Sequence, residues 1–231
     1  MNDREVANRI LTQINSLTGI GTYTWVNHYS ALVNAKNNID ISEFSFVGVD
    51  GQFLAYLLAK GIETTSADRV LPFLLQENIR VTCIGGSEKN AFLRREILKR
   101  KFPEIKLVGN YNGYSVNLID PDFVNTLQSE NPELIIIGTG SPRQEHLTLE
   151  IVRQLSLKSL EHGLSIVTCG GWLDQLLVDS YYPKWSYRYR VNWVVRLARE
   201  PLRLWKRYSI HATMAVLKVG QLRKYLREVV S

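Results

Sequence analysis

Short apolar runs alternate with amphipathic, helix-like segments along the first 170 residues of the chain. The apolar runs contain few charged residues, as strands do when a parallel sheet is covered on both faces. They occupy residues 22–26, 44–49, 79–86, 105–110, 133–138 and 164–171. The segments between them repeat apolar residues at three- and four-residue spacing, which is the period of a helix. This alternation predicts an α/β fold with a mainly parallel sheet and helices on both faces.

Local signals place the ends of the predicted helices, which cover residues 4–17, 29–37, 51–61, 89–102, 121–130 and 142–163. Gly61 is expected to cap the third of these helices, and Pro103 to stop the fourth. Ser141, Pro142 and Gln144 have the spacing of a capping box at the start of the last helix. The whole arrangement is that of a Rossmann-like sheet.

The strands stop near residue 185, and the rest of the chain reads as basic helix. Residues 181–231 hold twelve Lys and Arg against two acids, a charge of +10, so the other 180 residues carry −4 of the total of +6. We therefore divide the chain into an α/β core, 1–185, and a basic helical C-terminal appendage, 186–231. A charge asymmetry of this kind indicates an anionic partner, either nucleic acid or a membrane surface.

The appendage has an amphipathic pattern that Pro201 divides into two predicted helices. On a helical wheel the basic residues fall within about 100° of arc; they are Arg196, Arg199, Arg203, Lys206 and Arg207. Trp193, Val194, Leu197, Leu204 and Trp205 fall on the other side. The same pattern fits a helical pair packed on the core with a solvated face.

Composition narrows the possible classes further. Charged residues fill the start of the chain where a signal peptide would be apolar, and no apolar run reaches the roughly 18 residues of a spanning helix. Cys83 and Cys169 each end a strand-like run, and we expect buried free thiols, as suits a reducing cytosol. The four histidines show no metal-ligand spacing.

The strand-to-helix turns are the expected ligand sites, because ligands of open parallel sheets bind at the carboxyl ends of the strands. Asp50 ends one strand before Gly51. It is either the cap of the next helix or a carboxylate placed in the crevice as a general base. A second turn holds Gly138 and Gly140, which allow close backbone approach to a ligand at the start of a helix.

Other acidic motifs have simple structural interpretations. Asp120 and Asp122 form an Asp-x-Asp sequence of the kind that holds a divalent metal, but Asp120 also stands where a helix cap is expected. Asp68 and Arg69 read as a solvated pair at a helix start.

Taken together, these segments resemble the WecG/TagA/CpsF family of bacterial glycosyltransferases, family 26 of the sugar transferases, in order over roughly residues 20–210. "GTGSPRQE" is similar to the family's most specific signature, Gly-x-Pro-x-Gln-Glu. Six further segments resemble its other motifs: "WVNHYSALVNA", "VDGQF", "DRV", "CIGGSEKNAFLRREILKRKFPEIKLVGNYNGY", "CGGWLDQLLVDSYYPKW" and "VNWVVRLAREPLRLWKRY".

The resemblance implies an inverting, metal-independent transfer of a sugar from a UDP-sugar to a saccharide linked through diphosphate to a polyprenyl lipid. It places Asp50 at the position of the family's catalytic base, and no cofactor is expected. The expected substrate-binding residues are Asn27, Arg69, Gly138, Gly140, Gln144 and Glu145. Arg69 matches the arginine that approaches the acceptor diphosphate.

The resemblance also gives the appendage a role in reaching a lipid-linked acceptor at an anionic membrane surface. The residues expected to contact the acceptor diphosphate or the membrane are Arg190, Arg196, Arg199, Arg203, Lys206 and Arg207. The enzyme would then be cytoplasmic and peripheral on the inner face of the membrane, with no nucleic-acid partner. A homo-oligomer is possible.

Several positions depart from the family pattern. Trp25 stands where the family has an early Thr, Trp172 stands in place of a Phe, and "YYP" replaces Arg-Ala-Pro. Residues 71–75 read "LPFLL", where many members of the family have a Gly and an Asp. The donor and acceptor sugars therefore stay open. Two rival functions also remain: a nucleic-acid-binding protein with a basic arm, and a non-catalytic relative that binds UDP-sugars or lipid intermediates.

Overall fold

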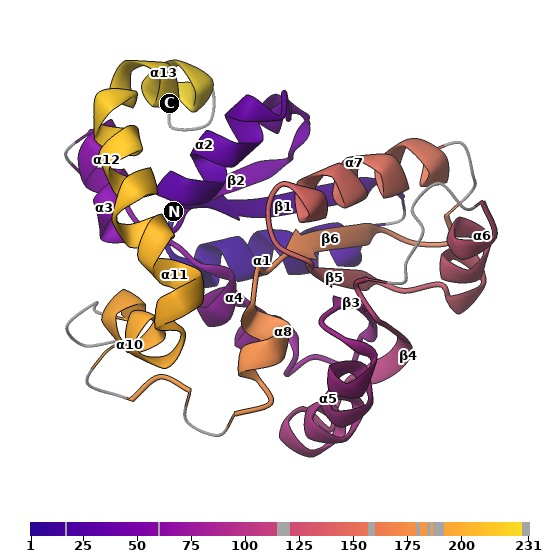
Figure 1. Cartoon of the computed structure of the whole chain (residues 1–231). Coiled ribbons are helices and arrows are strands. Elements are labelled where there is room, and N and C mark those ends of the chain that lie inside the picture. Colours follow the sequence, from indigo (N-terminus) through magenta and orange to yellow (C-terminus); the bar gives the residue numbers. More distant parts are fainter. Residues whose placement is uncertain are drawn as a thin grey trace.

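The computed structural model describes residues 1–16, 18–59, 61–114, 121–156, 160–178, 181–183, 186 and 192–227. Within them, six strands form one sheet in the order β2-β1-β6-β5-β3-β4 (Figure 1), and every neighbouring pair is parallel. The strands are β1 (Ile20–Val26), β2 (Phe46–Val49), β3 (Arg80–Gly85), β4 (Lys106–Tyr111), β5 (Leu134–Gly138) and β6 (Leu164–Thr168). The predicted α/β fold with a parallel, Rossmann-like sheet is confirmed.

Helices cover both faces of this sheet. The first half of the chain supplies α1 (Asp3–Ile14), α2 (His28–Lys36), the 3-10 turn η1 (Ile41–Glu43), α3 (Gln52–Leu58), α4 (Ala67–Leu74) and α5 (Glu88–Lys101). The second half supplies α6 (Pro121–Glu130), α7 (Arg143–Leu155), α8 (Trp172–Gln175), α10 (Asn192–Arg199), α11 (Pro201–Tyr208), α12 (Ile210–Leu217) and α13 (Val219–Tyr225).

Successive side chains of a strand point to opposite faces, so the strands contribute to separate cores. On one face, α1, α4 and α8 pack with Cys83, Ile136 and Val167. On the other, α6 and α7 pack with Ile135 and Ile137. A third cluster joins α2, α3, α12 and α13 beside the β1 and β2 edge. Both cysteines are free thiols, as predicted, with Cys83 buried and Cys169 partly buried.

Several predicted helix boundaries were wrong. Helix α3 ends at Leu58 with Ala59 as its cap, so Gly61 lies beyond the helix, with a φ of +88°. The predicted helix 142–163 ends at Leu155. Its predicted capping box does not form: Pro142 is the N-cap residue, without a side-chain cap hydrogen bond, after a cis Ser141–Pro142 bond. Phe102 caps α5, so the stop before Pro103 is confirmed.

The C-terminal helices line one side of the molecule in Figure 1 and differ in how firmly they join the core. Pro201 begins α11, which confirms the predicted break. Helix α10 has no buried residue among those described, and α11 buries Leu204. In contrast, α12 and α13 share the third core cluster through Ala215 and Leu222. The division at residue 186 stays a prediction. None of the described helices is long and apolar enough to cross a bilayer.

Candidate active site

Asn27 and Asp50 lie side by side at the carboxyl ends of β1 and β2. Val26 and Val49 are partners in the parallel register, so the residues that follow them leave the sheet as neighbours. The backbone N–H of Asp50 donates to the carbonyl of Val26 at 2.8 Å, which fixes this turn. Gly51, with a φ of +89° and no side chain, is the N-cap of α3. Asp50 therefore does not cap the helix, and its carboxylate remains for a ligand.

The surroundings of Asp50 bring its pKa close to neutrality. Burial raises this pKa to about 6, with a further contribution from the negative charge of Asp68. Arg196, Arg69 and Arg207 oppose the shift, because cations favour the ionised carboxylate. A carboxylate with such a pKa is suited to accept a proton at physiological pH.

The C-terminal helices deliver Arg196 to the same place. Its Nη2 atom is 2.9 Å from the position of a Cβ on Gly171, in the turn after β6. Its Nε atom is buried, and no described residue accepts a hydrogen bond from it. Burial raises the pKa values of Tyr182 and Tyr208, which interact electrostatically with both Arg196 and Asp50. The site therefore holds a guanidinium whose buried Nε atom has no described acceptor and whose charge acts on the Asp50 carboxylate.

Asn27 has a defined structural task besides its predicted contact with substrate. Its Oδ1 atom accepts from the backbone N–H groups of Tyr29 and Ser30 at 3.0 and 3.1 Å, and so caps α2. Because the capping task uses the amide oxygen, the amide nitrogen remains as the group that can donate to a ligand. The predicted role of Asn27 in substrate binding stays a prediction.

Gln144 and Glu145 form a buried network that joins two strand-to-helix turns. The Gln144 side chain donates to Glu145 Oε1 at 3.0 Å and accepts from the backbone N–H of Gly170 at 3.0 Å. The same Glu145 oxygen accepts from Ser141 Oγ at 2.9 Å. Because Gln144 is only 3 % exposed and uses both ends of its amide, this geometry favours positioning of the turns over direct contact with substrate.

Glycines let the backbone pack closely at the carboxyl ends of β3, β5 and β6. A Cβ on Gly85 would lie 2.8 Å from the carbonyl oxygen of Gly138, and one on Gly138 would lie 2.9 Å from that of Gly170. The chain leaves β3 and β5 in opposite directions, to β4 and β6, so the ends of these two strands form the topological switch point where open α/β sheets bind ligands. Gly140 follows, with a φ of +79° and open space around it.

Sequence reasoning missed Arg94, which lies beneath the end of β3. Arg94 is fully buried and donates to the backbone oxygens of Gly85 and Tyr111 and to Asn110 Oδ1, at 2.9, 3.2 and 2.8 Å. It forms no salt bridge with a described residue, so these three neutral oxygens are its partners. Its position on the buried stripe of α5, with Ala91 and Leu98, was the signal that could have identified it.

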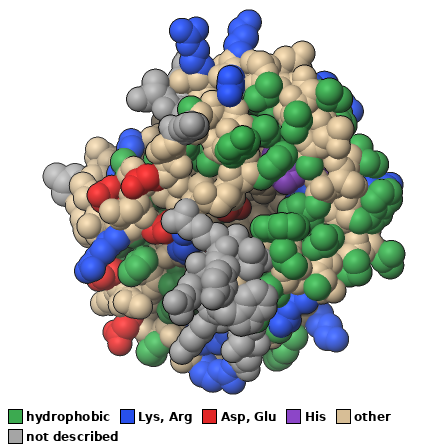
Figure 2. All heavy atoms as spheres, turned by 90° about the vertical axis from the view of Figure 1, so that its left-hand side faces the viewer, with side chains coloured by type: hydrophobic (Ala, Val, Ile, Leu, Met, Phe, Trp, Pro, Cys, Tyr) green, Lys and Arg blue, Asp and Glu red, His purple; other side chains and the backbone are tan. Residues whose placement is uncertain are grey.

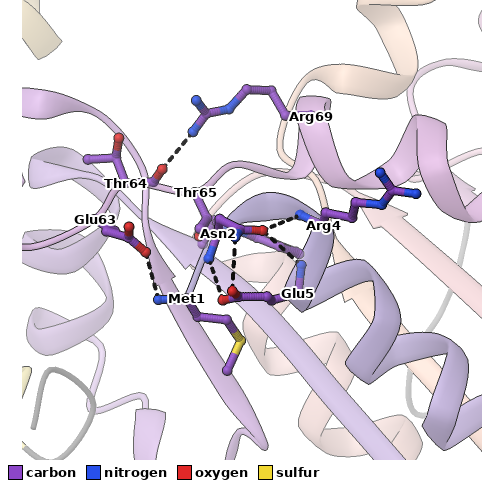
Figure 3. A network of polar contacts seen from close by, with 9 residues as sticks. Met1, Asn2, Arg4, Glu5, Glu63, Thr64, Thr65 and Arg69 are labelled. Atoms are coloured by element: carbon purple, nitrogen blue, oxygen red, sulfur yellow. Dashed lines mark hydrogen bonds and ion pairs between the residues drawn. The ribbon is translucent and has the colours of Figure 1, made fainter.

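Arg69 is held by the N-terminal segment of the chain. It donates to the Thr64 carbonyl at 2.8 Å and to Ser66 Oγ at 2.9 Å, and Asp3 lies 3.2 Å from its Nε atom. Figure 3 shows Arg69 pointing toward Thr64, beside the capping box that Asn2 and Glu5 form at the start of α1. Its charge still acts on Asp50. The predicted contact with an acceptor diphosphate is not tested.

The basic residues of the appendage do not share one solvated face. Arg196 turns into the site, the guanidinium of Arg207 lies 4.2 Å above the Tyr29 ring, and that of Arg199 lies 4.9 Å above Tyr181. Lys206 approaches the ring of Trp205 at 5.7 Å. The single basic arc treats α10 and α11 as one helix, although Pro201 begins a new one, and the membrane contact expected from it stays a prediction. Three predicted positions lie outside the described parts: Arg190, Asp120 and the Arg203 side chain. The described residues contain no cluster that could hold a metal.

The chain is also similar to known proteins. The chain is 29% identical over 189 residues to a Shigella boydii protein, "UDP-Gal:alpha-D-GlcNAc-diphosphoundecaprenol beta-1,4-galactosyltransferase". The alignment covers 77% of this chain and 76% of that protein. The profile described as "Glycosyl transferase WecG/TagA/CpsF family" matches residues 5–228. The chain therefore belongs to the WecG/TagA/CpsF family of glycosyltransferases.

Proposed function

We propose that the protein transfers a sugar from a UDP-sugar, with inversion, to a saccharide attached through diphosphate to a polyprenyl lipid. The observation that carries this proposal is the place of Asp50 at the carboxyl end of β2, where burial raises its pKa to about 6 and the charge of Arg196 acts on it. The similar Shigella boydii protein is named for a UDP-galactose donor and a diphosphoundecaprenol-linked acceptor.

Asp50 is the proposed general base. An acceptor hydroxyl attacks the anomeric carbon, transfers its proton to the Asp50 carboxylate and displaces UDP from the opposite face. One carboxylate is enough for such a displacement, and a positioned base contributes about 10²–10⁴-fold. The β linkage in the relative's name is the product that inversion forms from an α-configured donor.

The turn after β5, at the topological switch point, is the proposed site of the donor. Open space around Gly140 lets a nucleotide approach the backbone closely there. The buried charge of Arg94 favours an anion at this position, and the N-terminus of α7 faces the same edge of the sheet. Stabilisation of the leaving diphosphate by such fixed positive groups requires no metal ion.

Arg196 is the proposed partner of a diphosphate. A guanidinium offers paired donors to phosphate oxygens, and the buried Nε group of Arg196 has no described acceptor of its own. Because Arg196 lies against Gly171 and its charge acts on Asp50, the proposed base for the acceptor hydroxyl, we assign it to the diphosphate of the lipid acceptor.

Membrane contact through the C-terminal helices is the third part of the proposal. Figure 2 shows hydrophobic side chains gathered on this face beside a hollow, with basic side chains around it. The exposed apolar residues include Leu202 and Leu217, which are 90% and 79% exposed. Apolar side chains bordered by Lys and Arg are the pattern of a helix that lies on an anionic membrane surface. The cytoplasmic face of the membrane is the proposed location.

The test is UDP release by the purified protein in detergent, with a short-chain prenyl-diphosphate-N-acetylglucosamine acceptor. UDP-galactose is compared with other UDP-sugars, because the relative's name supports it as the first donor. Asp50→Asn is expected to abolish turnover and to leave UDP binding nearly intact. Wild-type rates in Asp50→Asn would remove this carboxylate from the mechanism. UDP binding without transfer to any lipid-linked acceptor would support the non-catalytic alternative.

A further inference from the structure

Two histidines bind the C-terminal end of α11, where backbone carbonyls lack partners within the helix. His28, at the start of α2, places Nε2 3.0 Å from the carbonyl oxygen of Arg207. His211, on α12, places Nδ1 2.9 Å from the carbonyl oxygen of Lys206. A carbonyl only accepts, so each imidazole nitrogen is the donor. The last carbonyls of a helix need such donors, and the helix dipole favours them.

His28 differs from His211 because it belongs to the core. Its ring is 5% exposed and meets the Phe53 ring of α3 edge-on at 5.1 Å. The ring of Tyr208 lies 6.0 Å away. The neighbouring Tyr29 supports the same contact, since its ring lies under Arg207 and edge-on to His211. His28 is thus fixed by the core and holds the end of α11.

This contact matters because the segment from α10 to α11 buries little apolar area. Among the described residues, Leu204 is the only apolar side chain of this segment that is buried. Tyr208 continues the connection into α10, because its ring lies 5.6 Å from that of Trp193. Arg196 belongs to α10 and reaches the site from there. A change in the position of α11 would therefore move Arg196.

We propose that His28 is a positioning residue, which fixes the end of α11 on the core and thereby holds Arg196 and Tyr208 beside Asp50. The expected effect of the His28 contact on catalysis rests on the proposed function. Its expected effect on the attachment of α11 to the core does not. His28 is next to Asn27 in the chain, so the residue that caps α2 and the residue that holds α11 are positioned by the same strand end.

Hydrogen exchange of the amides of residues 201–209 tests the structural part without any substrate. His28→Phe keeps an aromatic ring against Phe53 and removes the donor. We expect about three- to tenfold faster exchange in α11, the range that one hydrogen bond accounts for, with unchanged exchange in β1 and β6. His28→Gln restores a donor and should recover part of the protection. His162→Phe removes a histidine before β6, at the opposite end of the sheet, and should leave α11 unchanged.

Kinetics test the positioning part. His28→Phe should raise the KM for the lipid-linked acceptor several-fold and leave the KM for the UDP-sugar unchanged, with partial rescue in His28→Gln. Wild-type exchange of α11 in folded His28→Phe overturns the proposal. Faster exchange with an unchanged acceptor KM overturns the positioning role. If His28→Phe does not fold, His28→Leu replaces it under the same criteria. A wild-type enzyme without transferase activity would refute the proposed function while the exchange result still decides the attachment.

Discussion

The guanidinium of Arg196 lies against Gly171, with its Nη2 atom 2.9 Å from the place that a Cβ would occupy. These residues come from α10 and from the turn after β6. Gly171 has a φ of −90°, which any residue adopts. A glycine is therefore needed at this position to leave room for the guanidinium of Arg196, and not for its backbone conformation. The pair therefore provides a way to move Arg196 without changing its charge.

Gly171→Ala should lower sugar transfer about 10- to 100-fold, because the added methyl group displaces a guanidinium that the reaction needs in place. Thermal stability should change little, because a flexible side-chain end can shift. Gly220→Ala is the matched control, since a Cβ there meets nothing within 4 Å. Full activity in Gly171→Ala would show that the position of Arg196 is unimportant.

The pH profile of kcat/KM should report the ionisation of Asp50. The base acts when deprotonated, so the rate should rise about tenfold per pH unit below the pKa of about 6 and level off above it. Asp68→Asn removes a negative charge and should move this acidic limb to lower pH. Arg196→Gln removes a positive charge and should move it to higher pH. If the acidic limb keeps the same pH midpoint in both variants, the ionisation that it reports belongs to a group other than Asp50.

Gln144→Ala should destabilise the fold by about 1–3 kcal/mol, the cost of leaving buried polar groups unpaired. The Gly170 N–H loses its acceptor, whereas Glu145 Oε1 loses one donor and keeps that of Ser141, and urea denaturation measures the loss. Gln154→Ala is the control on the same helix, where the side chain forms a partly buried hydrogen bond with Glu150. Its cost should be smaller, about 0.5–1 kcal/mol. Equal effects in both variants would contradict a network that joins the two turns.

Leu202→Ser combined with Trp205→Ser should reduce binding to anionic vesicles about tenfold or more, because both side chains lose apolar area that the membrane would bury. Point variants are preferable to deletion of residues 190–231, since deletion also removes Leu204, Ala215 and Leu222 from the packed interior. Phe92→Ser on α5 is the control, as Phe92 is 72% exposed and lies outside the C-terminal helices.

Vesicle sedimentation in moderate salt separates binding through apolar side chains from purely electrostatic binding. Steep, log-linear loss of binding with salt, together with DNA binding, would instead favour the nucleic-acid alternative.

Attachment of α11 should weaken in acid. Burial lowers the pKa of His28. The hydrogen bond to the Arg207 carbonyl opposes this shift, whereas the charges of Arg207 and His211 lower the pKa further. Arg207 and Tyr208 of α11 and His211 of α12 are the titratable groups that face it. A lowered pKa means that stability is complete above the ordinary pKa of about 6.5 and is lost as pH falls through the folded-state value. Fluorescence of Trp193 and Trp205 should report the detachment of α11 as the pH falls. His28→Phe should remove the part of this pH dependence that comes from His28.

The fold and several boundaries could be predicted from sequence because they depend on local pattern. Buried strands and amphipathic helices have different periods, and Pro103 and Pro201 cannot continue a helix interior. Signals that compete locally were less reliable. Ser141, Pro142 and Gln144 fit a capping box, but Gln144 bonds Glu145 and Gly170 instead. Gly61 resembled a helix cap, yet α3 had already ended at Leu58.

The chain by itself determined the α/β class, the family motifs and the candidate base Asp50, because these depend on residue type, spacing and periodicity. Only the tertiary structure decided which groups meet Asp50. Arg196 lies far from Asp50 in the chain, and the packing of α10 on the core brings its charge close enough to act on that carboxylate. A helical wheel cannot show this, since it assigns faces to one straight helix and contains no information on the neighbouring surface. Burial of Arg94, Gln144 and Glu145 likewise depends on contacts between distant segments, which no local pattern specifies.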